Sequence, residues 1–399
     1  MSGTPDIAAA LKAAEELIES LKNYKGDGPT EHLAVLKQVD KTRALLETPF
    51  DVMSLQTEIL ATAGVLHVLQ RTDAINKIPA TGSITAEELA KAINIDVSAM
   101  KRIMRMAVCK GVTVETAPDT YAHNAMSEAY NPLGMGSFFN VAMDFVGCWV
   151  DLPEYFKTHN PEDLFDLKKS PFAYSRGKEG MTYYEVIAED IEQREVWNVA
   201  MQSMEKNMPT SGMFPWGTLE EAIQKEPERP FIVDIGGGRG RALLKIQEEH
   251  PGTFGGKLIL QDLPIVINSL NPEDIPNIEL MIYDIFTPQP IKNAHVYFMG
   301  HLLHDFYDPV CVQILKNTVS AMGPKSLLIV CDMLVPEVVE VNGPTQPYWL
   351  DFYMMCMTGK EKTLKEFNEI FDEAGLELVE VYPSGIGETV MLETRLKRA

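Results

Sequence analysis

A glycine-rich turn between an apolar run and a helical segment constrains the fold of this chain more than any other feature. It reads VDIGGGRG over residues 233–240. Glycines allow a ligand to approach the backbone closely, and the start of the following helix favours negatively charged ligand groups. From residue 230 onwards, apolar runs of strand length alternate with segments of helical periodicity. We therefore predict an α/β fold with a doubly wound, mostly parallel sheet, whose ligands bind beyond the carboxyl ends of the strands.

The spacing of the glycines argues against a dinucleotide cofactor. If Gly236 and Gly238 are the first two glycines of a GxGxxG motif, the third position falls on Arg241. The arginine side chain would obstruct the close packing of helix on strand, so NAD and FAD are disfavoured. No Lys-Ser or Lys-Thr pair follows the turn either, so the phosphate-binding loop of an ATPase is not predicted.

Acidic residues stand at the expected ends of the first three strands. Asp234 precedes the glycine-rich turn, and Asp262 ends the next apolar run, where a carboxylate can accept hydrogen bonds from both hydroxyls of a ribose. Asp284 follows the third run and can accept a hydrogen bond from an adenine amino group, with Ile285 and Phe286 packing on the ring. Each acid alone could merely cap a loop. Three in succession favour a nucleoside site.

The first 180 residues have mainly helical patterns. Thr85 can cap a helix while Glu88 reaches back to complete a capping box. A second helix is expected over residues 100–108, where apolar residues recur at i, i+3 and i+4, and Gly111 ends it. Residues 112–121 then have the pattern of a short β-wing. Helix, helix and wing together predict a winged-helix domain.

The charge of the chain decides between two uses of such a domain. Lys101, Arg102 and Arg105 would form the recognition face of a DNA-binding winged helix. However, the chain carries 57 acidic against 35 basic residues, for a net charge of −22. Such a surface repels phosphate backbones and anionic lipids, so we expect neither a nucleic acid nor a membrane as a partner. Dimerisation, or covering a pocket, is the favoured role.

Cysteine usage and hydropathy indicate a cytoplasmic protein. The five cysteines are widely spaced and form no CxxC pair, which favours reduced thiols. Charged residues from Asp6 to Glu16 interrupt any apolar run of a signal peptide. No run of about eighteen uncharged apolar residues is present, so no membrane span is expected.

These motifs resemble the class I O-methyltransferases of plant and fungal secondary metabolism, the caffeate O-methyltransferase-like family that uses S-adenosylmethionine (SAM). The resemblance begins near Leu55 and rests on DIGGGRG (234–240), LQDLP (260–264), YDIF (283–286), HLLHD (301–305) and GKEKT (359–363). It implies a winged-helix dimerisation and lid domain over residues 1–180 and a Rossmann-like SAM-binding catalytic domain over residues 181–399. It also implies a homodimer whose N-terminal domains interlock.

The resemblance further implies SAM as the cofactor and S-adenosylhomocysteine (SAH) as the product. Gly236 and Gly238 would line the methionine end of SAM, Asp262 would bind the ribose, and Asp284 the adenine. The complete set of residues expected to contact the cofactor is Trp197, Met201, Asp234, Gly236, Gly238, Asp262, Leu263, Asp284 and Ile285.

His304 is the expected general base, because it follows the fourth strand, near the expected position of the sulfonium. A phenol with a pKa near 10 is a poor nucleophile at neutral pH, and a histidine within hydrogen-bond reach can take its proton during the attack. Asp332 and Glu361 match the acidic positions that flank the histidine in the family. Either acid would fix the tautomer of the imidazole and stabilise the imidazolium.

Alternatives to this chemistry remain open. His301, His304 and Asp305 suggest a metal site, but such sites need more convergent groups, and no metal is expected. Gly300 stands where the family usually has a basic residue, Phe306 replaces a frequent tryptophan, and Asp332 is shorter than the common glutamate. Some fungal proteins of this type are pericyclases, which catalyse dehydration or cyclisation. O-methylation of a phenolic, hydrophobic, polyketide-like metabolite is the leading prediction, and a pericyclase is the alternative.

Overall fold

The computed structural model describes residues 5–26, 28–131, 134–204, 208–341, 343–385 and 387–398. The chain divides into two compact units. The first comprises residues 1–157 and 175–204, and the second comprises residues 158–174 and 205–399. Residue 180, the predicted boundary, lies in the stretch 175–204 that groups with the first unit.

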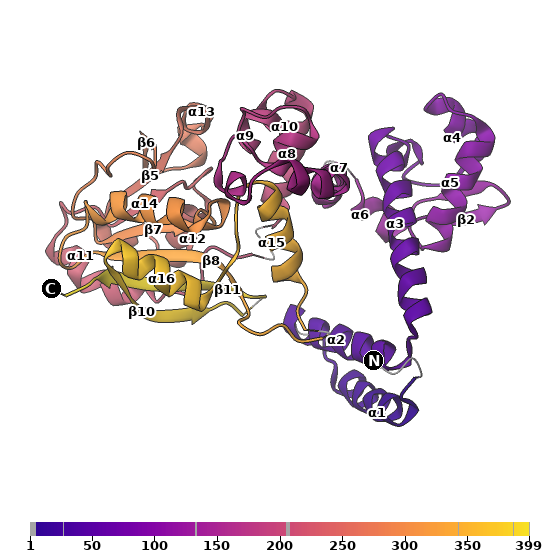
Figure 1. The fold of residues 1–399 in the computed structure, drawn as a ribbon, viewed down its shortest axis with the longest axis horizontal. Helices are drawn as coiled ribbons and strands as arrows, with labels where there is room; N and C mark the ends of the chain where they lie inside the picture. Colours follow the sequence, from indigo (N-terminus) through magenta and orange to yellow (C-terminus); the bar gives the residue numbers. More distant parts are fainter. Residues whose placement is uncertain are drawn as a thin grey trace. The chain divides into compact units, whose positions relative to one another are not determined.

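The first unit is mainly helical and contains one small sheet. Its helices are α1 (Ile7–Asn23), α2 (Pro29–Leu46), α3 (Pro49–Arg71), α4 (Ala86–Ala92), α5 (Val97–Cys109), α6 (Ala125–Ala129), α7 (Gly136–Thr158), α9 (Tyr183–Ala188) and α10 (Ile191–Met204). The sheet has the order β1-β3-β2 and consists of β1 (Ile84–Thr85), β2 (Val114–Ala117) and β3 (Thr120–Ala122). Figure 1 shows α4, α5 and β2 gathered at one end of this unit.

The predicted winged helix is present, and its start is capped as expected. The Thr85 hydroxyl accepts a hydrogen bond from the backbone N–H of Glu88, whose carboxylate accepts one from the backbone N–H of Thr85. On α5, Met100 and Met104 are fully buried. Lys101, on the charged face of α5, pairs with two acidic groups of the wing and of α4. This pairing neutralises part of the basic face that DNA recognition would require.

Helix α3 carries an apolar surface that the first unit itself leaves largely uncovered. By length and composition alone it is one helix that could cross a membrane, although only 11% of its most apolar window is buried. One such helix is weak evidence for a membrane span, and Glu58 interrupts its apolar surface. Ile59 and Leu60 are more than half exposed. An exposed apolar patch on a helix of this kind indicates an interaction surface.

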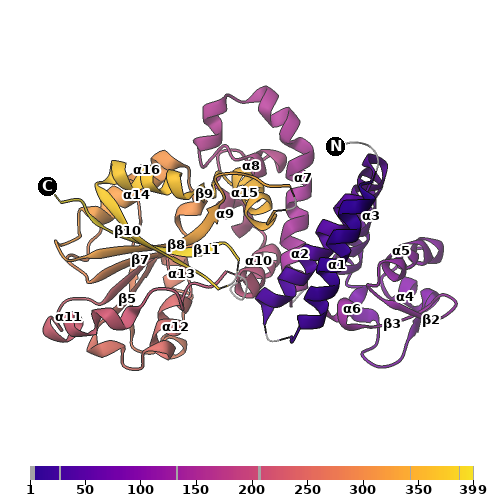
Figure 2. The ribbon, with the colours of Figure 1, turned by 90° about the horizontal axis from the view of Figure 1, so that it is seen from below.

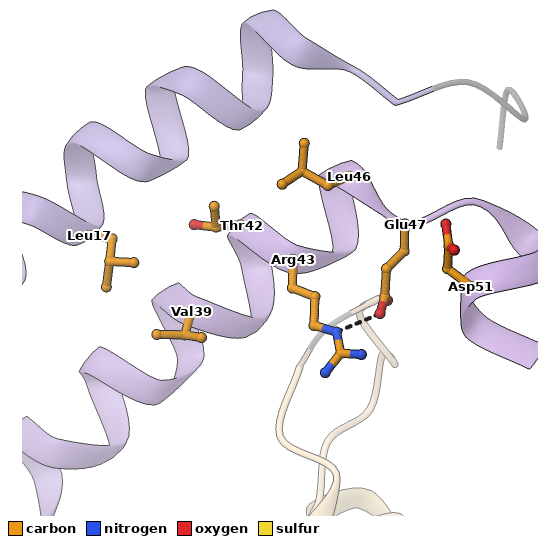
Figure 3. A pocket seen from close by; sticks show the side chains of 7 residues that line it. All are labelled: Leu17, Val39, Thr42, Arg43, Leu46, Glu47 and Asp51. Carbon is orange, nitrogen blue, oxygen red and sulfur yellow. Dashed lines mark hydrogen bonds and ion pairs between the residues drawn. The ribbon is translucent and has the colours of Figure 1, made fainter. Parts of the chain in front are cut away.

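The hairpin of α1 and α2 contains a hollow of about 520 Å³, shown in Figure 3. Leu17, Val39 and Leu46 supply its apolar wall, and an ion pair between Arg43 and Glu47 lies at its rim. This hollow and the exposed surface of α3 both lie within residues 7–71. Exposed large apolar side chains are more frequent there than in the rest of the described chain.

The second unit is built on an eight-stranded sheet with the main order β10-β11-β8-β7-β4-β5-β6, and β9 pairs with β8. The strands are β4 (Ile232–Ile235), β5 (Leu258–Asp262), β6 (Ile278–Ile282), β7 (Val296–Gly300), β8 (Leu327–Val335), β9 (Lys362–Thr363), β10 (Leu376–Pro383) and β11 (Thr389–Leu396). All pairs except β11 with β8 and β10 are parallel. Strand β11 lies between β8 and β10 and sets Val390 opposite Asp332.

Helices cover both faces of this sheet, as the doubly wound prediction requires. Figure 2 shows α14 and α16 on one side and α11 and α12 on the other. The main helices of the unit are α11 (Glu220–Lys225), α12 (Arg241–Glu249), α13 (Pro264–Ile267), α14 (Asp308–Val319), α15 (Gln346–Cys356) and α16 (Leu364–Ala374), and the short α8 (Pro171–Ser175) ends at the boundary between the units.

Each face of the sheet has its own hydrophobic core, and successive residues along a strand belong alternately to one core and to the other. On β4, Val233 packs with the side that includes α14 and α16, and Ile232 packs with the side that includes α11 and α12. Burial on both faces explains why the parallel strands read as continuous apolar runs in the sequence. The predicted α/β fold class is confirmed.

Candidate functional site

The candidate site lies where the order of the strands reverses. Strand β4 pairs with both β5 and β7, so the chain proceeds from β4 in one direction to β5 and β6 and in the other to β7 and β8. The loops after β4 and β7 therefore diverge, and ligands of such sheets bind at this point, beyond the carboxyl ends of the strands. This topology brings the glycine-rich turn, Asp262, Asp284 and the loop that carries His304 to the same edge of the sheet.

Two glycines of the turn have opposite steric roles. A Cβ on Gly237 would lie 2.3 Å from Oδ2 of Asp234 and 2.4 Å from Cδ1 of Leu260, so only glycine fits there. Gly238 has φ +56°, and a Cβ on it would meet no atom within 4 Å. The backbone at Gly238 thus faces open space, which fits close approach of a ligand. Gly236 also has positive φ, and a Cβ there would lie 2.9 Å from Leu302.

Asp262 fastens the end of β5 to the glycine-rich turn. Its Oδ2 accepts a hydrogen bond from the backbone N–H of Gly238 at 2.8 Å, and its Oδ1 accepts one from the N–H of Leu263 at 2.7 Å. Burial raises the pKa of Asp262, and these two backbone hydrogen bonds oppose the rise. Each carboxylate oxygen retains a further lone pair, which leaves acceptor capacity for two hydroxyls.

Asp234 is a buried carboxyl group that finds no partner among the described residues. Its side chain is only 1% exposed, and neither carboxylate oxygen has a hydrogen bond. Burial raises the pKa of Asp234 to about 8, and the negative charge of Asp262 adds to the rise. An unpartnered carboxyl under the glycine-rich turn fits a site that receives a donor or a cationic group from a ligand.

Asp284, the residue predicted to bind adenine, follows the end of β6 together with its apolar neighbours. Asp284 is exposed, and its Oδ1 accepts a hydrogen bond from the N–H of Phe286 at 2.9 Å. Ile285 is half-buried against the core, and Leu263, directly after β5, is 49% exposed. The backbone N–H of Tyr283 donates to the backbone carbonyl of Asp262, which ties the two strand ends together. The structure therefore brings Asp262, Leu263, Asp284 and Ile285 together.

Trp197 and Met201 belong to α10 in the first unit. The ring of Trp197 makes an edge contact with Tyr184 at 5.9 Å, and Met201 is 36% exposed. Because these two residues lie in the other unit, their contact with the cofactor stays a prediction.

His304 is held by carboxylates from two separate segments. It lies in a short 3-10 helix, Leu303–Asp305, after β7. Its Nδ1 is 3.0 Å from Oε1 of Glu361, and the same nitrogen is 3.9 Å from Oδ1 of Asp332. Its Nε2 lies 3.6 Å from Oδ1 of Asp305. The predicted grouping of His304 with Asp332 and Glu361 is therefore present in the geometry.

The electrostatic balance around His304 favours the imidazolium. Burial by itself would lower the pKa of His304, but the charges and hydrogen bond of Glu361, Asp332 and Asp305 outweigh it and raise the pKa to about 10. Glu361 and Asp332 are almost completely buried, so little solvent screens them. The site is built to stabilise a positively charged ring.

Two lysines and a glycine of the GKEKT segment fix the loop that carries His304. The ammonium of Lys362 is buried and donates to the carbonyls of Leu303, Phe306 and Lys360, each at 2.9 Å. The backbone N–H of Lys360 donates to the carbonyl of His304 at 2.8 Å. A Cβ on Gly359 would lie 2.5 Å from that carbonyl oxygen, so glycine permits this close approach.

Sequence reasoning missed the roles of His301 and Lys362. In the sequence His301 was grouped only with His304 and Asp305, whereas in the structure its Nδ1 lies 3.6 Å from Oδ1 of Asp332. It has φ +49°, a conformation that histidine adopts more readily than most residues. Lys362 looks like an ordinary surface lysine in the sequence. The only available signal for either residue was its presence in a motif with His304 or Glu361.

The departures from the family pattern have steric explanations at two positions. A Cβ on Gly300 would lie 2.9 Å from a ring atom of Phe298, so a basic residue there would require that ring to move. Phe306 is 9% exposed, and its ring makes an edge contact with Phe286 at 5.9 Å. Phe306 therefore packs beside Phe286 in the loop after β6.

Comparisons with known proteins agree with this architecture. The family model of the O-methyltransferase domain matches residues 149–377, and that of the O-methyltransferase dimerisation domain matches residues 53–132. O-methyltransferase hmp5 of Hypomyces subiculosus is 37% identical over 394 residues, covering 98% of each chain.

Solved structures show the same fold. OxaC in complex with SAH and oxaline is 25% identical, with a TM-score of 0.85 over 98% of this chain and 99% of that one. A structure described as a pericyclic reaction enzyme is 22% identical, with a TM-score of 0.82 over 97% of this chain and 99% of that one, a likeness of fold alone. The O-methyltransferase domain covers more than half of the chain, which therefore belongs to the SAM-dependent O-methyltransferases.

Proposed function

We propose that the enzyme methylates a phenolic hydroxyl of a hydrophobic, polyketide-like secondary metabolite, with His304 as general base. The contact between Nδ1 of His304 and Oε1 of Glu361 at 3.0 Å carries this proposal. A hydrogen bond at Nδ1 fixes the neutral tautomer that has its lone pair on Nε2. That nitrogen can accept the hydroxyl proton, and Glu361 and Asp332 then stabilise the resulting imidazolium.

The bound cofactor supplies an electrophilic methyl group on a positively charged sulfur. Gly236 and Gly238 would let its methionine end approach the backbone, and Asp234 offers an unpartnered carboxyl beneath the turn. Asp262 would accept hydrogen bonds from the ribose, and Asp284 from the adenine. Holding the attacking oxygen in line contributes to the rate in addition to the proton transfer.

Release of SAH tests the proposed reaction. Purified protein is incubated with SAM and a panel of phenolic polyketides, and SAH is quantified with and without each acceptor. Release that requires both an acceptor and His304 supports O-methylation. The alternative is a pericyclic reaction. Two observations favour it: the likeness in fold to a pericyclic reaction enzyme, and Gly300 at a position where the family usually has a basic residue. Tight SAM binding with no SAH release, together with conversion of a substrate to an isomer or a dehydrated product, would replace methylation by that alternative.

Asp262→Ala should weaken SAM binding by about 100-fold, because two hydrogen bonds to a charged acceptor are lost. Turnover at saturating SAM should fall much less, since Asp262 does not touch the reacting atoms. Isothermal titration calorimetry with SAH measures the affinity. Asp274→Ala, at the end of the short 3-10 helix Pro272–Asp274 before β6, is the matched control and should leave the affinity unchanged. If the dissociation constant of Asp262→Ala equals that of the wild type, Asp262 does not bind the ribose.

The raised pKa of His304 predicts an alkaline activity profile. The base must be neutral to accept a proton, and with a pKa of about 10 the imidazolium dominates below that pH. The value of kcat/KM, which reports ionisations of the free enzyme, should therefore rise about tenfold per pH unit between pH 7 and 9. Repulsion by the cationic cofactor should lower the pKa seen in kcat. A flat kcat/KM over this range would contradict His304 as the base.

We also propose that a second copy of the chain covers the exposed apolar side of α3. The dimerisation-domain match includes most of this helix, and Ile59 and Leu60 stand exposed on it. Sedimentation velocity should show a particle of twice the 44.5 kDa of one chain. A cytoplasmic location fits the five cysteines, which are all free thiols.

A further inference from the structure

Two polar groups face each other beside the proposed base. Nε2 of His301 lies 3.3 Å from the carbonyl oxygen of Met208, which can only accept a hydrogen bond. This contact places a ring proton on Nε2 and turns Nδ1 away from Met208. Nδ1 has no hydrogen-bond partner among the described residues. It lies 3.6 Å from Oδ1 of Asp332.

Asp332 is the centre of this arrangement. Its side chain is 0% exposed, and neither carboxylate oxygen has a hydrogen bond within the described part of the chain. A buried carboxylate without a hydrogen bond is costly, and a cation bound beside it would compensate its charge. His304 adds a third possible ligand, since its Nδ1 lies 3.9 Å from the same oxygen of Asp332.

The three groups can surround one metal ion. Their ligand atoms all lie within 4.8 Å of one another. Bonds of about 2.0–2.2 Å from zinc to nitrogen and oxygen put neighbouring ligand atoms about 3.3–3.6 Å apart. Small side-chain rotations would close the remaining difference. The contact between His301 and Met208 is the kind of hydrogen bond that orients a metal-bound histidine.

We propose that His301, His304 and Asp332 bind a zinc-class divalent cation, which inhibits the enzyme. Two imidazoles and one carboxylate suit Zn²⁺ or Co²⁺ better than Mg²⁺, which prefers oxygen ligands. On binding, His304 releases its Nδ1 proton to solvent and donates the freed lone pair to the metal. The ring is then held by the metal instead of by Glu361, and it loses the orientation that proton acceptance requires.

The binding follows from the geometry alone, whereas the inhibition rests on the proposed function. Co²⁺ is the direct probe, because its visible absorption reports nitrogen and oxygen ligands without any turnover. Titration of the full-length protein should give one site per chain, and Zn²⁺ should displace the signal. His301→Asn, which suits the left-handed backbone at this position, should weaken Zn²⁺ binding at least about 100-fold. His32→Asn, which alters an exposed histidine on α2, should bind as the wild type does.

Activity measurements complete the test. Zn²⁺ should inhibit SAH release in the wild-type enzyme, a chelator should restore it, and Mg²⁺ should have no effect. His301→Asn should lose the inhibition, so that its own rate of SAH release is the same with and without Zn²⁺. No Co²⁺ spectrum in the wild type, or equal Zn²⁺ affinity in wild type and His301→Asn, would overturn the site. Metal binding that depends on His301 but does not inhibit would leave the site standing and would count against His304 as the base.

Discussion

His304→Ala should lower kcat by about 10²–10⁴-fold while leaving the affinity for SAM nearly unchanged. This range is typical of losing a positioned general base. The cofactor residues at the ends of β4, β5 and β6 do not depend on the imidazole for their own hydrogen bonds, so the cofactor site should persist. Quantifying SAH release in single-turnover reactions measures the chemical step, and calorimetry with SAH measures the affinity.

Two further variants distinguish the loss of a general base from a general loss of structure. Glu361→Gln should give an intermediate loss, because it keeps an oxygen near Nδ1 of His304 but removes the charge that stabilises the imidazolium. His32→Ala, on the exposed part of α2, should behave as the wild type. If His304→Ala loses SAH binding as well as turnover, the histidine holds the site together instead of acting as the base.

Lys362→Met should destabilise the second unit by about 3 kcal/mol and lower kcat about 10–100-fold. The methionine side chain fills a similar space but removes the ammonium that donates to the carbonyls of Leu303, Phe306 and Lys360. The thiol of Cys311 still contacts the first two carbonyls. Hydrogen bonds from a charged donor contribute about 1.5–3 kcal/mol each, and the remaining contacts or water entry recover part of the loss. A looser loop around His304 misplaces the base, and small displacements reduce rates strongly.

Urea denaturation followed by tryptophan fluorescence measures the loss of stability. Lys365→Met is the matched control, because Lys365 is exposed and its ion pair with Glu369 spans 3.8 Å. Its effect should stay within about 0.5 kcal/mol. Equal stabilities of the two variants would show that the contacts of Lys362 do not hold the catalytic loop.

The sequence predicted the local features of this enzyme well. Strands, the glycine-rich turn and the acids at strand ends follow from short patterns, because burial on both faces produces apolar runs and tight turns require glycine. The grouping of His304 with Asp332 and Glu361 was also expected, but only from the resemblance to the O-methyltransferase family.

Contacts between distant segments could not be read in the same way. The contact between His301 and Asp332 depends on the backbone conformation after β7 and on the burial of Asp332 within β8. The burial of Lys362 depends on how the GKEKT segment packs against the loop of His304. Neither depends on a local pattern. The role of Gly237 in packing, as opposed to ligand approach, likewise appears only when Asp234 and Leu260 are placed beside it.

The position of β11 between β8 and β10 has a consequence for biosynthesis. Until residues 389–396 leave the ribosome, β8 is the outer strand of the forming sheet, and Asp332 lacks the neighbour that shields it. Exposed strand edges pair with other chains and promote aggregation. Asp332, opposite Val390 of β11, therefore has its full strand pairing only after residues 389–396 have joined the sheet.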